Sequence, residues 1–374
     1  MKKIKFTVLH PAGTNVDLIK DEGQIPFFLK KIDNNIEPTL VACNIDYKNI
    51  NTENINGVRI EHFPKILNYP LTGVVYLILN SKKIDWLNIY FAGRQAYIWM
   101  KLYKYLNKNG HIYLKLDMDF KSCDLYDSNR IERKIFTKNT KLADIVSVES
   151  IAVKDRIQKY SARKILLIED GVSQSVSKPV TNQKRDNVFI TVARLGTYQK
   201  ATEILLEAFE KSSKEHNWNL KLIGSIEEDF KKYIDKYFNK YPEMKERVCF
   251  CGVIKNRDSL YSEYRKAKVF VLPSRWESFG ISAAEALCNG CYLILSDSIP
   301  PANEMTRNGK YGEIVKTGDV ESLCEALRRA SKLEYTKSEI DELINYANMQ
   351  FSWDRICRKL LNEMYNVTGE IDDK

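Results

Sequence analysis

The stretch VFVLPSRWESFGISAAEAL, residues 269–287, decides the fold of the second half of the chain. Residues 269–272 form an apolar run typical of a buried parallel strand, and residues 282–289 have the pattern of a helix. The turn between the two therefore lies at the carboxyl end of a strand, where ligands of open α/β sheets bind. Unpaired amides at the start of the helix attract anions, so we expect a phosphate group as the ligand.

Two carboxylates, Glu277 and Glu285, flank this turn with seven residues between them, and they allow two interpretations. In the functional interpretation, both contact the ligand. In the structural interpretation, Ser282 and Glu285 form a capping box that only stabilises the helix, and Glu277 is a solvated loop residue. The stretch alone does not decide between them, because short motifs also match by chance.

A second unit of strand, turn and helix lies upstream, at residues 188–209. Its β-branched run ends in Arg194, Lys200 follows in a short turn, and apolar residues recur at helical spacing from Ile204 onward. A guanidinium forks onto phosphate oxygens and an ammonium supplies a point charge, so the two residues together suit a diphosphate. As isolated residues they would more often be plain surface charges. Their position at a strand's carboxyl end favours the functional interpretation of both turns.

The order of these motifs resembles that of the family-4 retaining glycosyltransferases, which use nucleotide sugars. The segments that carry the resemblance are Ala193-Arg194-Leu195, Lys200, residues 205–209, Leu222-Ile223-Gly224, Cys251-Gly252-Val253, and residues 273–280 with Glu285. The resemblance is clear from about residue 170 to the end of the sequence, and the match is looser in the first half. It implies an α/β chain of the GT-B type, in which two Rossmann-like, doubly wound parallel-sheet domains face a central cleft and a C-terminal helix crosses back.

Length and patterning also indicate two domains. A chain of 374 residues with 44% hydrophobic and 11% aromatic residues can bury two globular cores. Strand-like runs alternate with helical stretches in both halves, as in parallel sheets. In the first half these runs are residues 4–9, 39–42, 86–90, 112–116, 145–148 and 165–168. We predict a first domain at 1–172, a polar linker at 173–187, a second domain at 188–350, and an amphipathic segment at 351–374. The resemblance implies that this last segment packs back on the first domain.

The resemblance assigns roles to residues at matching positions. It implies that Arg194 and Lys200 neutralise charge on the leaving diphosphate and that Glu277 contacts the donor sugar, which makes these three the expected catalytic residues. Glu285 would accept hydrogen bonds from the ribose hydroxyls. The other expected donor-binding residues are Gly13, Val253, Ser278, Phe279, Gly280 and Ile281. No metal and no cofactor is then needed besides the donor, a sugar nucleotide of the UDP or GDP type.

The first half departs from the family at two positions. Many relatives carry a His after the strand that corresponds to residues 87–89, where this chain has Tyr90, and another His ends the next strand, where it has Asp117. We therefore assign roles toward the sugar or the acceptor to Tyr90 and Asp117. Gly13, in the first loop, would face the donor diphosphate, or it serves only a tight turn.

The net charge of +9 is unevenly placed, because residues 1–172 contain 27 Lys and Arg but only 19 Asp and Glu. A basic first domain suggests an anionic partner, and in the resembling family this domain receives the acceptor, often a lipid-linked saccharide. Tyr97, Lys101, Lys104 and Lys108 share one helical face, as in a helix at a membrane surface or in an ordinary solvated Lys stripe. The chain shows no nucleic-acid module, no transmembrane run and no signal peptide pattern. We expect a cytoplasmic protein, or one peripheral to the inner face of a membrane.

Eight cysteines raise the question of a metal site. Cys249 and Cys251 share one face of a probable strand, and Cys288 and Cys291 bracket a helix end, so four thiolates could in principle bind zinc. Free buried thiols in a reducing compartment are the ordinary alternative.

These observations together predict a retaining glycosyltransferase. It would move a hexose-type sugar from a nucleoside diphosphate sugar to a saccharide or a lipid-linked saccharide in the biosynthesis of a surface polysaccharide or other glycan. Two alternatives remain open: a nucleotide-sugar epimerase of the same fold, and a non-catalytic GT-B protein that only binds the nucleotide sugar.

Overall fold

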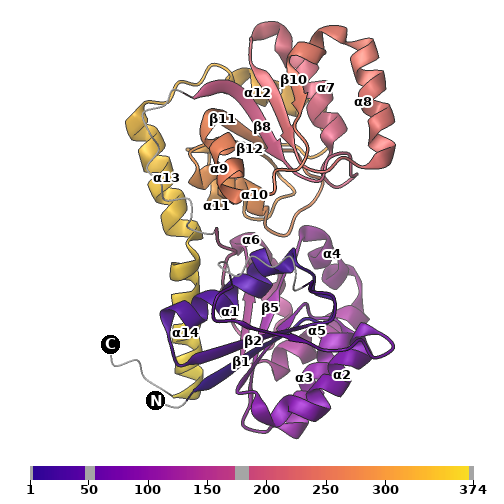
Figure 1. Cartoon of the computed structure of the whole chain (residues 1–374), viewed down its shortest axis with the longest axis vertical. Helices are drawn as coiled ribbons and strands as arrows, with labels where there is room; N and C mark the ends of the chain where they lie inside the picture. Colours follow the sequence, from indigo (N-terminus) through magenta and orange to yellow (C-terminus); the bar gives the residue numbers. More distant parts are fainter. Residues whose placement is uncertain (1–2, 47–54, 173–184, 370–374) are drawn as a thin grey trace. The chain divides into compact units, whose positions relative to one another are not determined.

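The computed structural model describes residues 3–46, 55–172 and 185–369, and most of the predicted linker, residues 173–184, lies outside the described residues. The chain divides into two compact units. Unit 1 comprises residues 1–171 and 353–374, and unit 2 comprises residues 172–352. Each unit contains one parallel sheet covered by helices on both faces (Figure 1). The predicted doubly wound parallel sheets are therefore confirmed.

Unit 1 has a seven-stranded sheet in the order β3-β2-β1-β4-β5-β6-β7. Its strands are β1 Ile4–Leu9, β2 Ile36–Ala42, β3 Arg59–His62, β4 Trp86–Tyr90, β5 His111–Leu116, β6 Ile145–Val148 and β7 Ile165–Leu167. Its helices are α1 Asp21–Ile32, α2 Tyr69–Asn80, α3 Arg94–Leu106, α4 Phe120–Ser128, α5 Arg130–Leu142, α6 Ile151–Ile157 and α14 Trp353–Thr368. Strands β4 and β6 are buried at every residue because helices cover both faces, which explains why most of their residues are apolar.

The helix α14 belongs to unit 1, although it follows unit 2 directly in the sequence. It packs against α1, and the Trp353 ring stacks on Phe28 with 6.3 Å between ring centroids. These two side chains join the core on one face of the sheet, whereas α2, α3 and α5 cover the other face.

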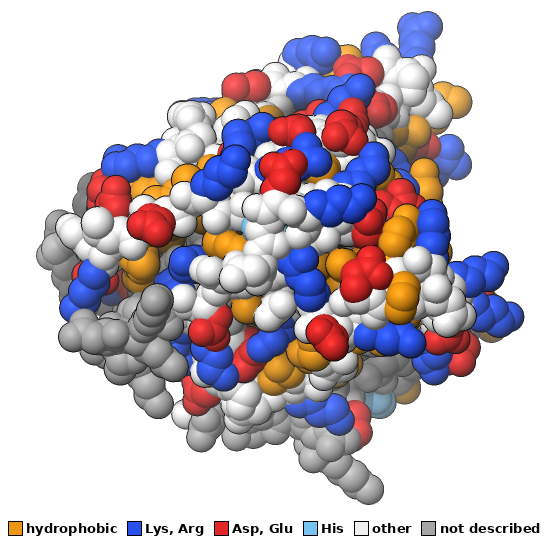
Figure 2. All heavy atoms as spheres, turned by 90° about the horizontal axis from the view of Figure 1, so that it is seen from above, with side chains coloured by type: hydrophobic (Ala, Val, Ile, Leu, Met, Phe, Trp, Pro, Cys, Tyr) orange, Lys and Arg blue, Asp and Glu red, His pale blue; other side chains and the backbone are white. Residues whose placement is uncertain are grey.

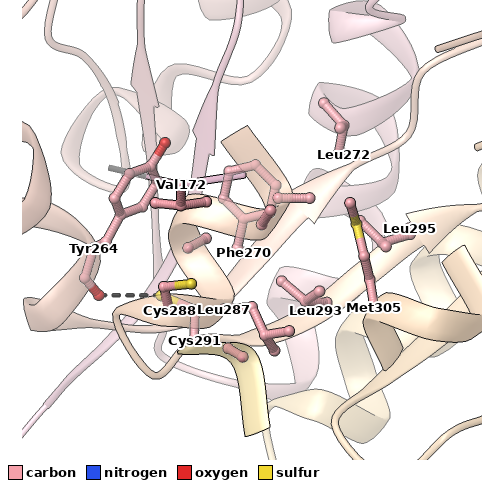
Figure 3. Packing of buried hydrophobic residues seen from close by; sticks show 14 of the residues in the cluster. Val172, Tyr264, Phe270, Leu272, Leu287, Cys288, Cys291, Leu293, Leu295 and Met305 are labelled. Atoms are coloured by element: carbon pink, nitrogen blue, oxygen red, sulfur yellow. Dashed lines mark hydrogen bonds between the residues drawn. The ribbon is translucent and has the colours of Figure 1, made fainter. Parts of the chain in front are cut away.

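Unit 2 has a six-stranded sheet in the order β10-β9-β8-β11-β12-β13. Its strands are β8 Asp186–Val192, β9 Asn219–Ile223, β10 Val248–Phe250, β11 Ala267–Leu272, β12 Tyr292–Ser296 and β13 Gly312–Val315. Its helices are α7 Thr202–Ser212, α8 Glu228–Lys240, α9 Arg257–Lys266, α10 Ile281–Cys288, α11 Ala302–Thr306, α12 Val320–Ala330 and α13 Lys337–Phe351. One core of this unit fills the space between the sheet and α10 with side chains such as Phe270, Leu287 and Leu293 (Figure 3).

The cysteines of unit 2 do not gather into a zinc site. Cys288 and Cys291 are buried in the core shown in Figure 3, where the Cys291 thiol donates to the Tyr264 carbonyl oxygen at 3.1 Å. Cys249 and Cys251 are exposed instead. Within the described ranges, no group of three or more potential ligands includes a cysteine. The four-thiolate zinc interpretation is therefore wrong.

Basic and acidic side chains are mixed over the face shown in Figure 2, with apolar side chains only in small groups among them. A mixed surface produces no broad electrostatic field of one sign on that face. In the parts of the chain that the structure describes, no helix is long and apolar enough to cross a membrane.

The strand order reverses beside the first strand of each sheet, between β1 and β4 in unit 1 and between β8 and β11 in unit 2. The loops that leave the two central strands diverge to opposite sides at such a switch point. They open a crevice outside the carboxyl ends of the strands, where doubly wound proteins bind ligands. These two positions direct the search for a site.

Candidate active site

At the switch point of unit 2, Arg275 joins the loop after β11 to the loop after β8. Its backbone N–H donates to the Gln199 carbonyl oxygen and its Nη1 to the Tyr198 carbonyl oxygen, both at 2.7 Å. Its Nη2 pairs with Glu203 at 2.6 Å, and the guanidinium lies 4.1 Å from the centroid of the Tyr198 ring. These contacts fix the two loops to each other. No role was predicted for Arg275 from the sequence, where its one distinguishing feature is its position next to the aromatic Trp276.

The two loops bring Lys200 and Glu277 into an ion pair, Nζ to Oε1, across 77 residues of sequence. Their side chains are 19% and 10% exposed, so the pair is shielded but still reachable from solvent. The turn that precedes Lys200 depends on Gly196, at φ +84°, because a Cβ there would lie 2.3 Å from the Phe230 side chain. The pair places one ammonium and one carboxylate where the sheet would bind a ligand.

Arg194 lies on the same loop as Lys200, but among the described residues its ion pair is with Glu227 and not with Glu277. Its side chain is 64% exposed and pairs with Glu227, with 3.3 Å between Nε and Oε1. An exposed pair of this kind contributes little to stability, so Arg194 can turn toward a ligand at small cost.

The next predicted residues, Ser278 to Ile281, lead into α10. Gly280 is the N-cap at φ +90°, a backbone conformation that favours glycine, and it provides no side-chain cap. The amides of Ile281 and Ser282 consequently have no acceptor among the described residues. They lie at the N-terminus of α10, which begins directly after the loop and suits an anion. The Phe279 ring is buried against Phe351, so only the backbone of Phe279 is available to a ligand.

The capping-box interpretation of Ser282 and Glu285 is wrong. The helix begins at Ile281 after a glycine cap, which makes Ser282 its second residue. Glu285 instead accepts from Arg257 Nη2 at its Oε1, and from the Tyr264 hydroxyl at its Oε2 with a distance of 3.3 Å. Glu285 is buried, so these two donors are what keep its charge compensated.

Arg257, the first residue of α9, was not predicted from the sequence. Its Nη2 also donates to the Tyr261 hydroxyl at 2.8 Å, and its guanidinium lies over the Tyr261 ring. Burial acts to lower the pKa of Arg257, but the negative charge of Glu285 more than offsets this and holds the pKa above its ordinary value. The loop between β10 and α9, which precedes Arg257, contains Val253. This predicted donor-binding residue is 60% exposed.

The switch point of unit 1 brings together the loops after β1 and β4. Gly13 closes a tight turn with a hydrogen bond from its N–H to the His10 carbonyl oxygen at 2.8 Å, and a Cβ there would lie 2.6 Å from the His10 ring. Turn geometry alone thus explains this glycine. The His10 ring meets the Tyr90 ring edge-on, with 6.2 Å between centroids. The buried Tyr90 hydroxyl and Oδ1 of Asp117 have no hydrogen-bond partner among the described residues.

A buried charge cluster lies beside these residues and was missed in the sequence. Lys115, which is fully buried in β5, contacts Glu149 at 2.8 Å, Asp170 at 3.0 Å and Asp21 at 3.6 Å. Burial would lower the pKa of Lys115, but these three carboxylates more than offset it and raise the pKa well above its usual value. Burial also raises the pKa of Asp170 to about 7 and that of Glu22, next to Asp21, to about 7.

The comparisons with known proteins agree with this geometry. Residues 173–349 match the family model of glycosyl transferases group 1. The chain is 28% identical over 190 residues to an uncharacterized glycosyltransferase, MJ1607, of Methanocaldococcus jannaschii, covering 50% of this chain and 47% of that protein. It spans about half the length of the curated relatives it matches first.

Two solved structures are similar over nearly the whole chain. The apo form of the lipopolysaccharide outer core galactosyltransferase WaaB aligns with a TM-score of 0.72 and 17% identity, over 97% of this chain and 99% of that one. Anabaena Alr3699/HepE in complex with UDP aligns with a TM-score of 0.71 and 16% identity, over 97% and 100%. These likenesses show the GT-B fold of two Rossmann-like units. Residues 173–349, just under half of the chain, are thus similar to the glycosyl transferases group 1 family.

Proposed function

We propose that this protein is a retaining glycosyltransferase that moves a hexose-type sugar from a nucleoside diphosphate sugar to a hydroxyl of a saccharide or a lipid-linked saccharide. The observation that carries the proposal is the ion pair between Lys200 and Glu277 at the β8/β11 switch point, within the segment that matches the family. A cation and a carboxylate held there suit the two ends of a sugar phosphate.

In this mechanism, the cationic side chains act on the leaving group. Lys200 and Arg194 neutralise the negative charge that grows on the diphosphate as the bond to the sugar breaks, and the free amides of Ile281 and Ser282 assist them. Glu277 accepts hydrogen bonds from hydroxyls of the donor sugar. The acceptor hydroxyl attacks the face from which the diphosphate leaves and passes its proton to a phosphate oxygen, so that the configuration is retained. Charge stabilisation comes from side chains and amides, without a metal or a further cofactor.

The nucleoside end of the donor is assigned to α10 and to the loop before α9. Glu285 would accept from ribose hydroxyls, sharing its carboxylate with Arg257 and Tyr264, while Val253 would lie near the base. We favour UDP over GDP, because the similar HepE structure contains UDP.

The acceptor is assigned to unit 1, where the unpartnered polar atoms of Tyr90 and Asp117 lie near the first switch point. The basic excess of residues 1–172 suits an anionic acceptor or membrane, and we propose a cytoplasmic protein that is peripheral at the inner face of a membrane. Lys104 does not serve this purpose, because its Nζ bonds Asp144 at 2.6 Å and the Gly110 carbonyl oxygen at 2.9 Å. Lys101 and Lys108 remain as candidates for a surface contact.

The test begins with a thermal-shift screen of UDP, GDP and ADP sugars, because a ligand that binds the folded state raises its stability with the logarithm of concentration. The stabilising sugar nucleotide is then incubated with a panel of saccharide acceptors. Release of nucleoside diphosphate that depends on the acceptor supports the proposal. Conversion of the sugar without an acceptor indicates an epimerase, and binding without turnover indicates a non-catalytic protein.

A further inference from the structure

Cys249 and Cys251 form a pair of neighbouring thiols at the end of the edge strand β10. Their Sγ atoms are 3.4 Å apart, and both side chains are exposed. Alternate residues of a strand point to the same side, which explains why the two thiols converge. The other six cysteines of the chain are buried. This pair is therefore the accessible dithiol of the molecule.

A positively charged side chain lies close to the pair. Lys221 lies opposite Cys249 in the neighbouring strand β9, and its Nζ bonds Glu263 at 2.5 Å. Partial burial and the adjacent thiol raise the pKa of Cys251 to about 11, while the ammonium of Lys221 opposes that rise. A bound cation would displace the protons of the thiols, as it does at other thiolate sites.

The separation of the sulfurs suits a shared metal ion better than a disulfide. Metal–sulfur bonds of about 2.3 Å span a 3.4 Å separation with an angle at the metal of roughly 95°. A two-coordinate ion prefers a near-linear angle, for which the two exposed side chains would rotate until their sulfurs are about 4.6 Å apart. A disulfide instead needs an S–S distance of about 2.05 Å and a Cβ–Cβ distance of about 3.8 Å. Residues two apart in an extended strand are about 6.6 Å apart along it, so closing a disulfide would bend β10.

The number of ligands points to the kind of ion. No third Cys, His, Asp or Glu completes a three-ligand group with the two thiols in the described ranges, which argues against a tetrahedral zinc site. Two soft thiolates without harder ligands select monovalent copper over the other common ions. We propose that Cys249 and Cys251 form a binding site for a thiophilic metal ion, monovalent copper in particular. This proposal does not depend on the proposed function.

The experiment titrates the reduced full-length protein with monovalent copper, without oxygen, in competition with bicinchoninate as a chromophoric chelator. We expect one equivalent to bind, and affinity to fall by about 100-fold or more in Cys249→Ser and in Cys251→Ser, because each variant loses the chelate. Cys43→Ser, which changes a buried cysteine of unit 1, is the matched control and should retain full affinity. Circular dichroism checks that all variants fold.

Two results would overturn the proposal. One is equal copper uptake by the wild type and the Cys249→Ser/Cys251→Ser double variant, or no uptake by either. The other is a protein that binds no copper but, after air oxidation, loses two hydrogens by mass spectrometry with a peptide linked through Cys249 and Cys251. That result would make the pair a redox couple and not a metal site.

Discussion

The ion pair between Glu285 and Arg257 provides a test that separates a structural from a functional role of Glu285. In Arg257→Met the buried Glu285 carboxylate keeps only the Tyr264 hydroxyl. Breaking a buried pair costs about 3 to 5 kcal/mol, and because a third of the Arg257 side chain is exposed we expect a smaller cost, about 2 to 3 kcal/mol. For a domain of the size of unit 2, residues 172–352, that lowers Tm by roughly 4 to 12 °C.

Glu285→Gln should weaken the binding of UDP, measured by isothermal calorimetry. Hydrogen bonds to a charged group contribute about 1.5 to 3 kcal/mol, so the loss of a carboxylate that accepts from ribose hydroxyls raises Kd by roughly 10- to 150-fold. This substitution also leaves the Arg257 guanidinium without its charge partner, which lowers Tm. Weak binding by this variant alone therefore does not prove contact with ribose.

The double variant Arg257→Met/Glu285→Gln resolves the ambiguity. It buries no unpaired charge, so its Tm should recover relative to Arg257→Met, while its UDP affinity should stay as low as that of Glu285→Gln. Lys255→Met, at an exposed position in the loop that precedes α9, is the control for lost positive charge. If the double variant bound UDP with the wild-type Kd, Glu285 would serve only to hold Arg257, and its assignment to ribose would be refuted.

Three further predictions concern other parts of the molecule. Lys200→Ala should lower turnover by about 100-fold, whereas Lys236→Ala, at an exposed site on α8, should not. EDTA should leave the wild type active. Full loss of activity in EDTA that manganese restores would contradict the metal-free mechanism. Burial raises the folded-state pKa of Glu22 from 4.5 to about 7. Between these two pH values the folded protein holds a proton on Glu22 that the unfolded protein has lost, so the free energy of unfolding falls as pH rises from about 4.5 to 7. In Glu22→Gln this part of the pH dependence should vanish in chemical denaturation series at several pH values, and an unchanged difference between pH 5 and pH 7 would contradict the assignment. Replacing Lys101 and Lys108 by Ser should weaken sedimentation with vesicles of acidic lipid by up to about 1 kcal/mol per residue, and unaltered sedimentation would mean that these side chains are merely solvated.

The strands that the sequence predicted best are those buried on both faces. Strands β1, β4 and β6 have the predicted bounds, because burial under helices on both sides requires mostly apolar residues. Strands β4 and β6 are buried at every residue, and in β1 only Ile4 and Lys5 are not. Strand β3, Arg59–His62, was not predicted. It lies at the edge of the sheet and none of its residues is buried, so its sequence contains no apolar run that could reveal it.

The site was predictable only as far as strand ends determine it. Lys200 and Glu277 meet because each follows the carboxyl end of a strand, β8 or β11, and these two strands are neighbours at a switch point. The sequence shows where a strand ends, so this meeting could be predicted from the order of the motifs. Arg257 and Arg275 reach their partners with long side chains from a helix start and a loop. The direction of such a side chain depends on which carboxylates and carbonyls the folded chain brings near it, and no periodicity of the sequence records that.

Both carboxylates of the proposed donor site are paired before any ligand binds, Glu277 with Lys200 and Glu285 with Arg257. Pairing avoids the cost of an isolated charge in a shielded site, but it also means that a ligand must replace contacts and not only add them. A diphosphate that attracts the Lys200 ammonium releases an oxygen of Glu277, which can then accept from a sugar hydroxyl. Under the proposed function, binding of the phosphates and binding of the sugar would thus be coupled through one ion pair, so a free hexose, which offers Lys200 no anion, would gain little from Glu277.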